Sequence, residues 1–312
     1  MQKKSIPLLI AAAGSVVLTL TAAPATHAAD PHPGVSTEAR QHHGLGALPD
    51  RRTGKLPSHA QISSALRAIA PVTGTAHAAA VTAGRVPSSA GVDLSRYAAS
   101  PGNQGSVNSC VSWAIAHSAF SILENEQGIS GGPQAPMYTY SQLVRGQNIG
   151  TYPSATLAIA ERQGVDARSH YWQGDYDYTT QPTSSQRANA ARWRLSGHVA
   201  LRTGTSITTD VQSALNHGEP VIVSIPYYDG FGRLNTQQAD TYTYYPSPAD
   251  VSSWQRQGRP SHEVTIVGYN SQGVKIENSW GTGWGHGGFA TLPWRFLTNL
   301  ALDANALGRL VQ

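Results

Sequence analysis

The sequence predicts an α+β fold, with helices in the first half of a folded domain and strands in the second. Two observations predict it. Residues 109–124 carry apolar side chains on every side of a helical repeat, which is typical of a central, buried helix. After Gly218 and Pro220 the sequence changes to short β-branched runs separated by glycines. A cleft between two such halves is a common place for a substrate to bind.

The remaining elements are predicted from shorter patterns. The expected further helices are residues 141–145, 154–162 and 210–216. The expected strands are residues 221–225, 263–269, 274–277 and 288–292. Residues 175–195 are polar and fit neither pattern, so no element is predicted there.

Residues 1–29 have the features of a secretory signal peptide. Lys3 and Lys4 precede an apolar stretch, residues 6–23, and small residues suited to cleavage follow it. The stretch is also long enough to span a bilayer, so a retained membrane anchor is the alternative. We expect cleavage, which gives an extracellular protein without stable membrane association.

Residues 30–91 form a low-complexity leader rich in Ala, Gly, Pro, Ser and His. One weak helix is expected at residues 60–69, where apolar residues share one face. The leader is either a pro-segment that blocks the active site until it is removed or a plain linker. The folded domain is expected at residues 92–312, divided at about residue 205 into a helical and a β-rich part.

Composition narrows the classes of function. The chain has a net charge of +4 without a dense Lys/Arg run, so nucleic-acid binding is not expected. Its formal G-x-G-x-x-G at residues 283–288 is followed by a strand and not by a helix, which argues against a dinucleotide site. There is no cysteine cluster for zinc. We therefore expect no cofactor and no metal. We also expect a monomer, although no sequence feature bears on the oligomeric state.

The one cysteine, Cys110, is expected at the start of the buried helix, where unpaired N–H groups and the helix dipole favour a thiolate. His262 directly precedes an expected strand and can exchange a proton near neutral pH. Asn278 ends the next strand, sixteen residues later, where its oxygen can accept the imidazole N–H. Taken singly, the three could equally be a packing cysteine, a surface histidine and a turn residue.

Three segments resemble the papain-like cysteine peptidases and occur in that family's order. They are residues 103–110 (NQGSVNSC), 261–269 (SHEVTIVGY) and 278–285 (NSWGTGWG). The step of 152 residues from Cys110 to His262 is also near the family's spacing. The resemblance covers about residue 92 to the C-terminus. It implies a two-lobe fold with a helical N-terminal lobe, a β-barrel-like C-terminal lobe and the active-site cleft between them.

The resemblance also implies roles for four residues. Cys110 would attack the scissile carbonyl, and His262 would be its ion-pair partner and then protonate the leaving amine. Asn278 would orient His262. Gln104 would donate a side-chain N–H to the oxyanion together with the backbone N–H of Cys110.

Three more residues are implied to bind substrate. Gly150 lies near the paired glycines with which the family binds an extended peptide. Ser261 would edge the pocket for the residue before the cleavage site, and Trp280 would shield the His–Asn pair from water.

The expected activity is that of a secreted cysteine endopeptidase acting on proteins or peptides. The same thiol chemistry would suit an exopeptidase, an amidase or a transpeptidase. Val107 replaces a cysteine that the family usually has, and Val111 replaces an aromatic residue. These departures keep open a third possibility, a papain-like peptide-binding module with weak or no catalysis.

Overall fold

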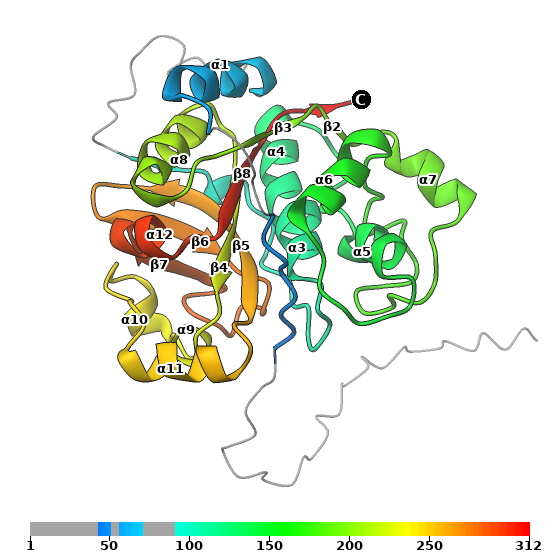
Figure 1. Cartoon of the computed structure of the whole chain (residues 1–312). Coiled ribbons are helices and arrows are strands. Elements are labelled where there is room, and N and C mark those ends of the chain that lie inside the picture. Colours follow the sequence, from blue (N-terminus) through cyan, green and yellow to red (C-terminus); the bar gives the residue numbers. More distant parts are fainter. Residues whose placement is uncertain (1–42, 51–55, 71–90) are drawn as a thin grey trace, which may run out of the picture. The chain divides into compact units, whose positions relative to one another are not determined.

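The structure is a computed structural model, and it describes residues 43–50, 56–70 and 91–312. Its main feature is an antiparallel sheet of seven strands (Figure 1). The strands are β1 Val92–Asp93, β2 Arg194–Leu195, β3 His198–Ala200, β4 Val221–Pro226, β5 Ser261–Tyr269, β6 Gly273–Glu277, β7 Phe289–Pro293, β8 Asp303–Leu307 and β9 Leu310–Val311. The order in the sheet is β3-β8-β4-β5-β6-β7, and β1 pairs with the far end of β5. Strands β2 and β9 form a separate pair.

The sheet is open. Within the described residues β3 and β7 are the two ends of the path, and no pairing joins them. The expectation of a barrel-like second lobe is therefore not confirmed. The α+β class is confirmed, because the protein has both helices and an antiparallel sheet.

Helices lie on both sides of the sheet (Figure 1). They are α1 His59–Ile69, α3 Cys110–Ser112, α4 Phe120–Gln127, α5 Pro136–Val144, α6 Pro153–Arg162, α7 Ser184–Ala190, α8 Ile207–Asn216, α9 Asp229–Gly232, α10 Thr236–Ala239, α11 Pro248–Arg256 and α12 Trp294–Leu300. Two short 3₁₀ turns, η1 Ser95–Tyr97 and η3 Gly204–Ser206, complete the set with the π-helical stretch η2 Trp113–Ala119.

The predicted central helix is confirmed as one helical run, residues 110–127, formed by α3, η2 and α4. All but two of its side chains are at least nine-tenths buried, as the apolar pattern requires. The run ends at Gly128, whose φ of 69° closes the helix in the left-handed conformation that glycine adopts without strain. It brings Cys110 to the edge of β5, which α3 contacts.

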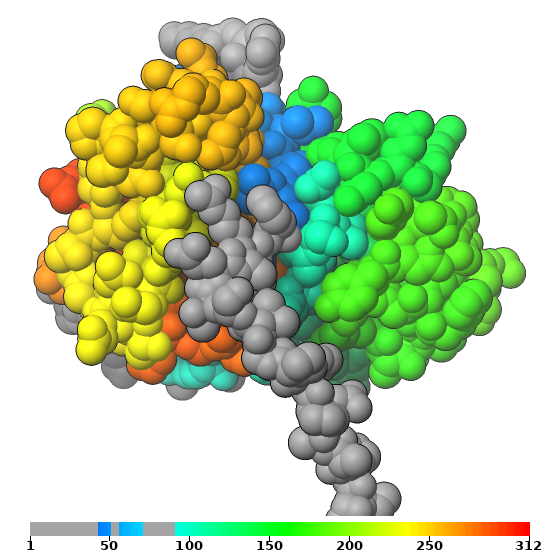
Figure 2. Space-filling view, turned by 90° about the horizontal axis from the view of Figure 1, so that it is seen from below, coloured from blue at the N-terminus to red at the C-terminus, as the bar shows by residue number. Residues whose placement is uncertain are grey.

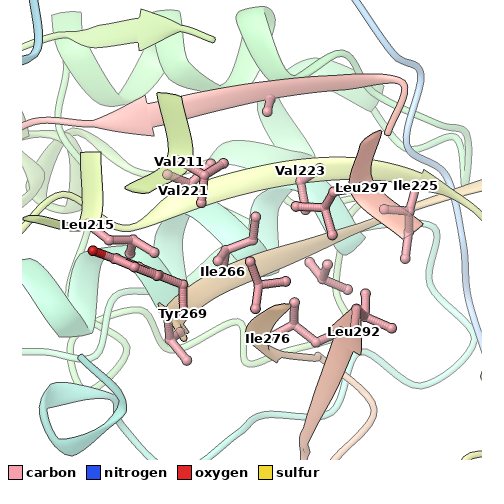
Figure 3. Close-up of a cluster of buried hydrophobic side chains, with 14 of the residues drawn as sticks. Val211, Leu215, Val221, Val223, Ile225, Ile266, Tyr269, Ile276, Leu292 and Leu297 are labelled. Atoms are coloured by element: carbon pink, nitrogen blue, oxygen red, sulfur yellow. The ribbon is translucent and has the colours of Figure 1, made fainter. Parts of the chain in front are cut away.

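The sheet separates two hydrophobic cores, and β4 contributes to both because successive side chains of a strand point to opposite faces. Val221, Val223 and Ile225 pack into the core on one side, where they meet β5, β6, β7 and α12 (Figure 3). Ile222 points to the other side and packs with the central helix. Strand β4, which pairs with β5, is therefore packed on both faces.

The described parts of the leader pack on this domain. Helix α1 begins with a capping box, in which the Ser58 side chain accepts from the Gln61 N–H and the Gln61 side chain accepts from Ser58. Ile62 and Leu66 are buried in the core with α8. The helix expected at residues 60–69 is thus confirmed. The predicted signal peptide lies outside the described residues, and none of the helices described is long and apolar enough to cross a membrane.

Most predicted elements are confirmed with small shifts at their ends. Helices α5 and α8 begin earlier than expected, α5 with a proline in its first turn. The polar region for which no element was predicted contains α7, which starts at a capping box formed by Thr183 and Gln186. Helices α9 to α12 and strands β1, β2, β3, β8 and β9 were not predicted, because their segments are too short to show a clear repeat.

Candidate active site

The only cysteine, Cys110, is the first residue of the helical run and has no exposed surface. Its thiol lies against the start of β5 and against the leader, and receives backbone hydrogen bonds from Glu263, Val111 and Ala47. Cys110 therefore begins the central helix, as the sequence predicts, and lies where that helix contacts β5, covered by residues of the leader.

His262 is the second residue of β5 and is also wholly buried. Its Nε2 donates to Oδ1 of Asn278, the residue that follows β6, over 2.7 Å. The indole of Trp280 stacks on the imidazole with a centroid distance of 4.4 Å. Because Nε2 carries the proton in this bond, Nδ1 is the nitrogen left to exchange a proton, and it has no hydrogen-bond partner among the described residues.

Gln104 is in the loop before Cys110 and is fully buried against the loop that follows β6. Its Nε2 donates to the Val107 carbonyl over 2.7 Å, and its Oε1 accepts from Ser279 Oγ over 2.6 Å. The backbone N–H of Gln104 also donates to the Ser279 carbonyl. The side-chain amide is therefore fixed in orientation and has one N–H beyond the bond to Val107.

Residues 43–50 of the leader, here called the cover segment, run over this site. Figure 2 shows the segment in blue between the yellow and orange residues of the β-rich half and the cyan and green residues of the helical half. Its backbone pairs in parallel with Thr151: the Thr151 N–H donates to Gly46, and the Leu48 N–H donates to Thr151. The segment thus occupies the strip beside Gly150 where the resemblance implies that a substrate binds.

Side chains fix the cover segment at both halves of the protein. Ser261 Oγ donates to the Ala47 carbonyl over 2.5 Å. The His43 ring stacks on Trp280 at 4.6 Å, on the residue that also stacks on His262. The Leu45 N–H donates to Asn108 Oδ1 over 3.1 Å.

Two glycines allow the cover segment to lie close to the loop before Cys110. A Cβ at Gly44 would lie 2.0 Å from the Val107 carbonyl oxygen. A Cβ at Gly46, whose φ is 116°, would lie 2.5 Å from the Asn108 carbonyl oxygen. Neither position has room for a side chain, so the fit of the cover segment depends on these two glycines.

Burial sets the charge state of the covered site. Desolvation, with a smaller contribution from the nearby Glu263 carboxylate, raises the pKa of Cys110 to about 12. Desolvation lowers the pKa of His262 to about 4, although the bond to Asn278 opposes this. The thiol and the imidazole are therefore both neutral at pH 7 while the segment is in place, and the pair is not in its nucleophilic form.

A metal would have little to bind here. Within the described ranges, no group of three or more His, Cys, Asp or Glu side chains is placed to hold a metal ion. The groups present are a thiol at the start of the central helix, an imidazole of β5 bonded to an amide oxygen just after β6, and an amide donor in the loop before the thiol. These are groups that suit nucleophilic attack on a carbonyl group.

Comparison with known proteins agrees with this chemistry. The model of the family described as "Papain family cysteine protease" matches residues 92–296. The chain belongs to the papain family of cysteine proteases. The match starts where the leader ends in the sequence analysis and contains each of the seven residues proposed for the site.

Individual members of the papain family are more distant. A Blomia tropicalis protein named "Cysteine protease" is 28% identical over 199 residues, which cover 60% of this chain and 55% of that protein. The match thus spans about half the length of that relative. Xylellain, a cysteine protease from Xylella fastidiosa, is 17% identical with a TM-score of 0.65, over 89% of this chain and 100% of that chain.

A third relative is the Carica candamarcensis cysteine protease CMS1MS2, solved in complex with E-64. It is 16% identical with a TM-score of 0.53, over 72% of this chain and 99% of its own. At these identities, the two solved structures support the papain-like two-lobe fold and nothing finer.

The structure brings together the residues that the sequence analysis selected. Cys110, His262, Asn278 and Gln104 are all buried at the junction of the central helix with β5 and β6. Gly150 is next to the cover segment: a Cβ there would lie 2.7 Å from the Gly46 carbonyl oxygen. Ser261 and Trp280 contact the segment directly.

Two features of the site were missed. The contact of the cover segment with the site had no sequence signal, because residues 43–50 lie in a low-complexity leader. Asn148 was also overlooked: its Oδ1 accepts from the Asn108 N–H, and its backbone carbonyl accepts from the Asn108 side chain. These bonds fix the loop that leads to Cys110, and an isolated asparagine pair forty residues apart is not visible as a motif.

Proposed function

We propose that this papain-family protein is a secreted endopeptidase that hydrolyses peptide bonds with Cys110 as its nucleophile. The observation that carries the proposal is the 2.7 Å bond from His262 Nε2 to Asn278 Oδ1. It leaves the other imidazole nitrogen to serve the only thiol of the chain. A packing cysteine would need neither an oriented imidazole nor a tryptophan stacked over it.

In the proposed reaction, His262 Nδ1 takes the thiol proton, and the Cys110 sulfur forms a bond to the scissile carbonyl carbon. The C–N bond then breaks, and the imidazolium gives its proton to the leaving amine, which leaves a thioester. Water, deprotonated by the same imidazole, attacks the thioester and releases the carboxylate product and the thiol. Asn278 keeps the imidazole in the orientation that both steps need.

Negative charge develops on the carbonyl oxygen in both steps. Gln104 is proposed to stabilise it with its second side-chain N–H, together with the backbone N–H of Cys110 at the helix start. The bonds of Gln104 to Val107 and Ser279 support this role, because a donor that is already fixed does not have to reorganise during the reaction.

Gly150, Ser261 and Trp280 are proposed to bind the substrate chain. The cover segment supports this assignment, since it is an extended peptide that bonds to Thr151 beside Gly150 and to Ser261. A substrate backbone would use the same donors and acceptors once the segment has left.

The cover segment is proposed to be the inhibitory part of the leader, not a plain linker. Its contact with the Cys110 thiol and its burial of both proposed catalytic groups support this interpretation. Secretion is proposed from the signal-like residues 1–29, which would take the chain to the outside of the cell with the site still covered.

The proposal can be tested with a full-length Gly44→Ala/Gly46→Ala variant, in which the cover segment no longer fits. The variant is incubated with a mixture of peptides blocked at both ends, and the products are identified by mass spectrometry. Internal cleavage that disappears on Cys110→Ala is expected. Release of terminal residues alone from unblocked peptides would instead indicate an exopeptidase, and binding of the peptides without cleavage would indicate a binding module.

A further inference from the structure

Asn108 lies two residues before the proposed nucleophile, and its side chain contacts the cover segment. Its Oδ1 accepts a hydrogen bond from the Leu45 N–H over 3.1 Å. The backbone of the segment is also close, since a Cβ at Gly46 would lie 2.8 Å from the Cβ of Asn108. An extended peptide on the path of the cover segment therefore meets the Asn108 side chain directly.

Two hydrogen bonds to Asn148 fix the orientation of the Asn108 side chain. Asn108 Nδ2 donates to the Asn148 carbonyl over 3.0 Å, and the Asn108 N–H donates to Asn148 Oδ1 over 2.8 Å. Because the amide nitrogen is used in this way, the amide oxygen is the atom that faces the cover segment. The acceptor is therefore in place before a peptide arrives, which lowers the cost of ordering on binding.

Asn148 is itself held by a buried tyrosine. The Tyr140 hydroxyl lies 3.0 Å from Asn148 Oδ1 and 2.8 Å from the Ile149 carbonyl oxygen, and Tyr140 has no exposed surface. Asn148 Nδ2 donates to the Ser106 carbonyl over 3.3 Å. The loop that leads to the nucleophile is thus tied to the strip along which the cover segment runs.

The bonds that hold this loop use both donors of Asn108 and leave its side-chain oxygen to the peptide over the site. Among the described residues, the Leu45 N–H is the one donor to Asn108 Oδ1. When the cover segment leaves, that bond is lost while the two bonds to Asn148 remain. The oxygen is then an oriented acceptor that a bound peptide can use.

The contact is close to the proposed point of cleavage. Ala47 is the residue of the cover segment that contacts the Cys110 thiol, and Leu45 lies two residues before it. Two residues of extended chain span about 7 Å at most. The substrate residue whose N–H reaches Asn108 is therefore within about two positions of the scissile bond.

We infer that Asn108 is a substrate-binding residue, which accepts one backbone N–H of the peptide through Oδ1 after the cover segment has left. Asn148 and Tyr140 are positioning residues, because they act on the substrate through Asn108. The inference deepens the proposed function and rests on it, since it adds a contact at the same site. It also narrows the substrate class: proline alone lacks the backbone N–H, so the site would disfavour proline at this one position.

The test removes single N–H groups from the substrate. It uses the Gly44→Ala/Gly46→Ala protein and a cleaved peptide in which one amide bond near the scissile bond, but not that bond itself, is replaced by an ester. A series of such peptides moves the ester along the chain on both sides, and each ester deletes one N–H while it keeps every side chain. We expect one ester position to lower kcat/KM about 2- to 12-fold, the effect of one hydrogen bond.

The same series is then measured with Asn108→Ala added to the protein. At the position that Asn108 binds, the loss caused by the ester should disappear, because the variant has no acceptor for the N–H. The readout is a ratio of two peptides on one protein, so a general loss of activity in the variant does not affect it. Ester effects that are the same with and without Asn108→Ala at every position would overturn the inference.

The positioning role of Asn148 is tested with the same pair of peptides. Asn148→Ala should reduce the ester effect, since it removes the acceptor of the Asn108 N–H, and Asn148→Asp, which keeps an acceptor, should restore it. Gln147→Ala is the matched control, because Gln147 is an exposed amide side chain next to Asn148, and it should leave the ester effect unchanged. Equal ester effects in Asn148→Ala and Gln147→Ala would exclude the positioning role.

Two failures are distinguishable. If the peptides are cleaved and no ester effect depends on Asn108, the inference is wrong and the proposed function stands. If no peptide is cleaved although iodoacetamide labels Cys110, the proposed function is wrong, and protection of Cys110 from iodoacetamide tests the inference by binding alone. Weaker protection by one ester peptide than by its amide parent, with the difference lost in Asn108→Ala, supports the inference, and equal protection overturns it.

Discussion

Alanine at both Gly44 and Gly46 should release the cover segment and make Cys110 reactive. At Gly44 the new Cβ would lie 2.0 Å from the Val107 carbonyl oxygen, where contacts below about 3.0 Å are not found in real structures. The backbone must therefore withdraw by about 1 Å or more at this residue. Such a shift breaks the 2.8 Å bond from the Gly44 N–H to Gly105, and the strain at Gly46 adds to it.

The expected gain in reactivity can be worked out from the thiol. With a pKa of about 12, the covered Cys110 has a thiolate fraction at pH 7 of about 10⁻⁵. An ordinary exposed thiol, with a pKa near 8.5, has a fraction of about 3 × 10⁻², roughly 3,000-fold more. Thiolates of lower pKa are weaker nucleophiles, which offsets roughly 30- to 60-fold of this gain. The net increase in alkylation rate is then about 50- to 100-fold, before the added access is counted.

The assay is the rate of iodoacetamide alkylation at pH 7, followed by intact mass. Gly283→Ala is the control variant, since a Cβ at this exposed glycine meets no atom within 4 Å. We expect Gly283→Ala to react as slowly as the unaltered protein. An alkylation rate of the double variant that stays within about threefold of the unaltered protein would refute the reasoning, because it would mean that the cover segment does not control the thiol.

Three further outcomes follow from the site. Asn278→Ala removes the acceptor of the His262 N–H. Because a hydrogen bond to a charged group contributes about 1.5–3 kcal/mol, kcat/KM should fall about 10- to 150-fold. An unchanged kcat/KM would exclude the orienting role. Gln104→Ala should lower kcat about 10²–10³-fold with little change in KM, and a change confined to KM would contradict the oxyanion role. Glu277 retains only 1% exposure, and desolvation raises its pKa to about 8. Its neutral form therefore favours folding below about pH 4.5, and this contribution is lost as pH rises through 8. Glu277→Gln, which keeps an acceptor for Ser118, should therefore flatten the loss of unfolding free energy between pH 4.5 and 8, a loss of at most about 5 kcal/mol, in urea titrations of the Cys110→Ala protein.

The residues of the proposed catalytic centre could be predicted from the sequence because each lies in or next to an element with a recognisable local pattern. The central helix is visible as a run of apolar residues, and β5 as a β-branched run after His262. Asn278 follows β6 at a fixed distance from His262, so a short hairpin joins the two. Motifs of this kind are readable because each residue is positioned by an element that contains it or adjoins it.

Contacts between distant segments could not be predicted in the same way. The cover segment bonds to Thr151 and Ser261, which lie more than 100 and 200 residues away, through backbone groups that every residue possesses. The nearness of Asp303 to Glu263 depends on the pairing of β4 with both β5 and β8, and residues 303–307 are too short a run to show that pairing in the sequence. Glu263 could nonetheless be recognised as unusual from the sequence, since it is a carboxyl within an apolar strand and a buried carboxyl needs a partner.

The central claim is that Cys110 and His262 form a thiolate–imidazolium pair once the cover segment has left. Its most direct test is the rate of iodoacetamide alkylation as a function of pH in the Gly44→Ala/Gly46→Ala protein, with and without His262→Ala. We predict rapid labelling near pH 5 that requires His262, because an imidazolium beside the sulfur stabilises the thiolate far below its usual pKa of about 8.5. Labelling that follows an ordinary thiol curve in both proteins would contradict the account.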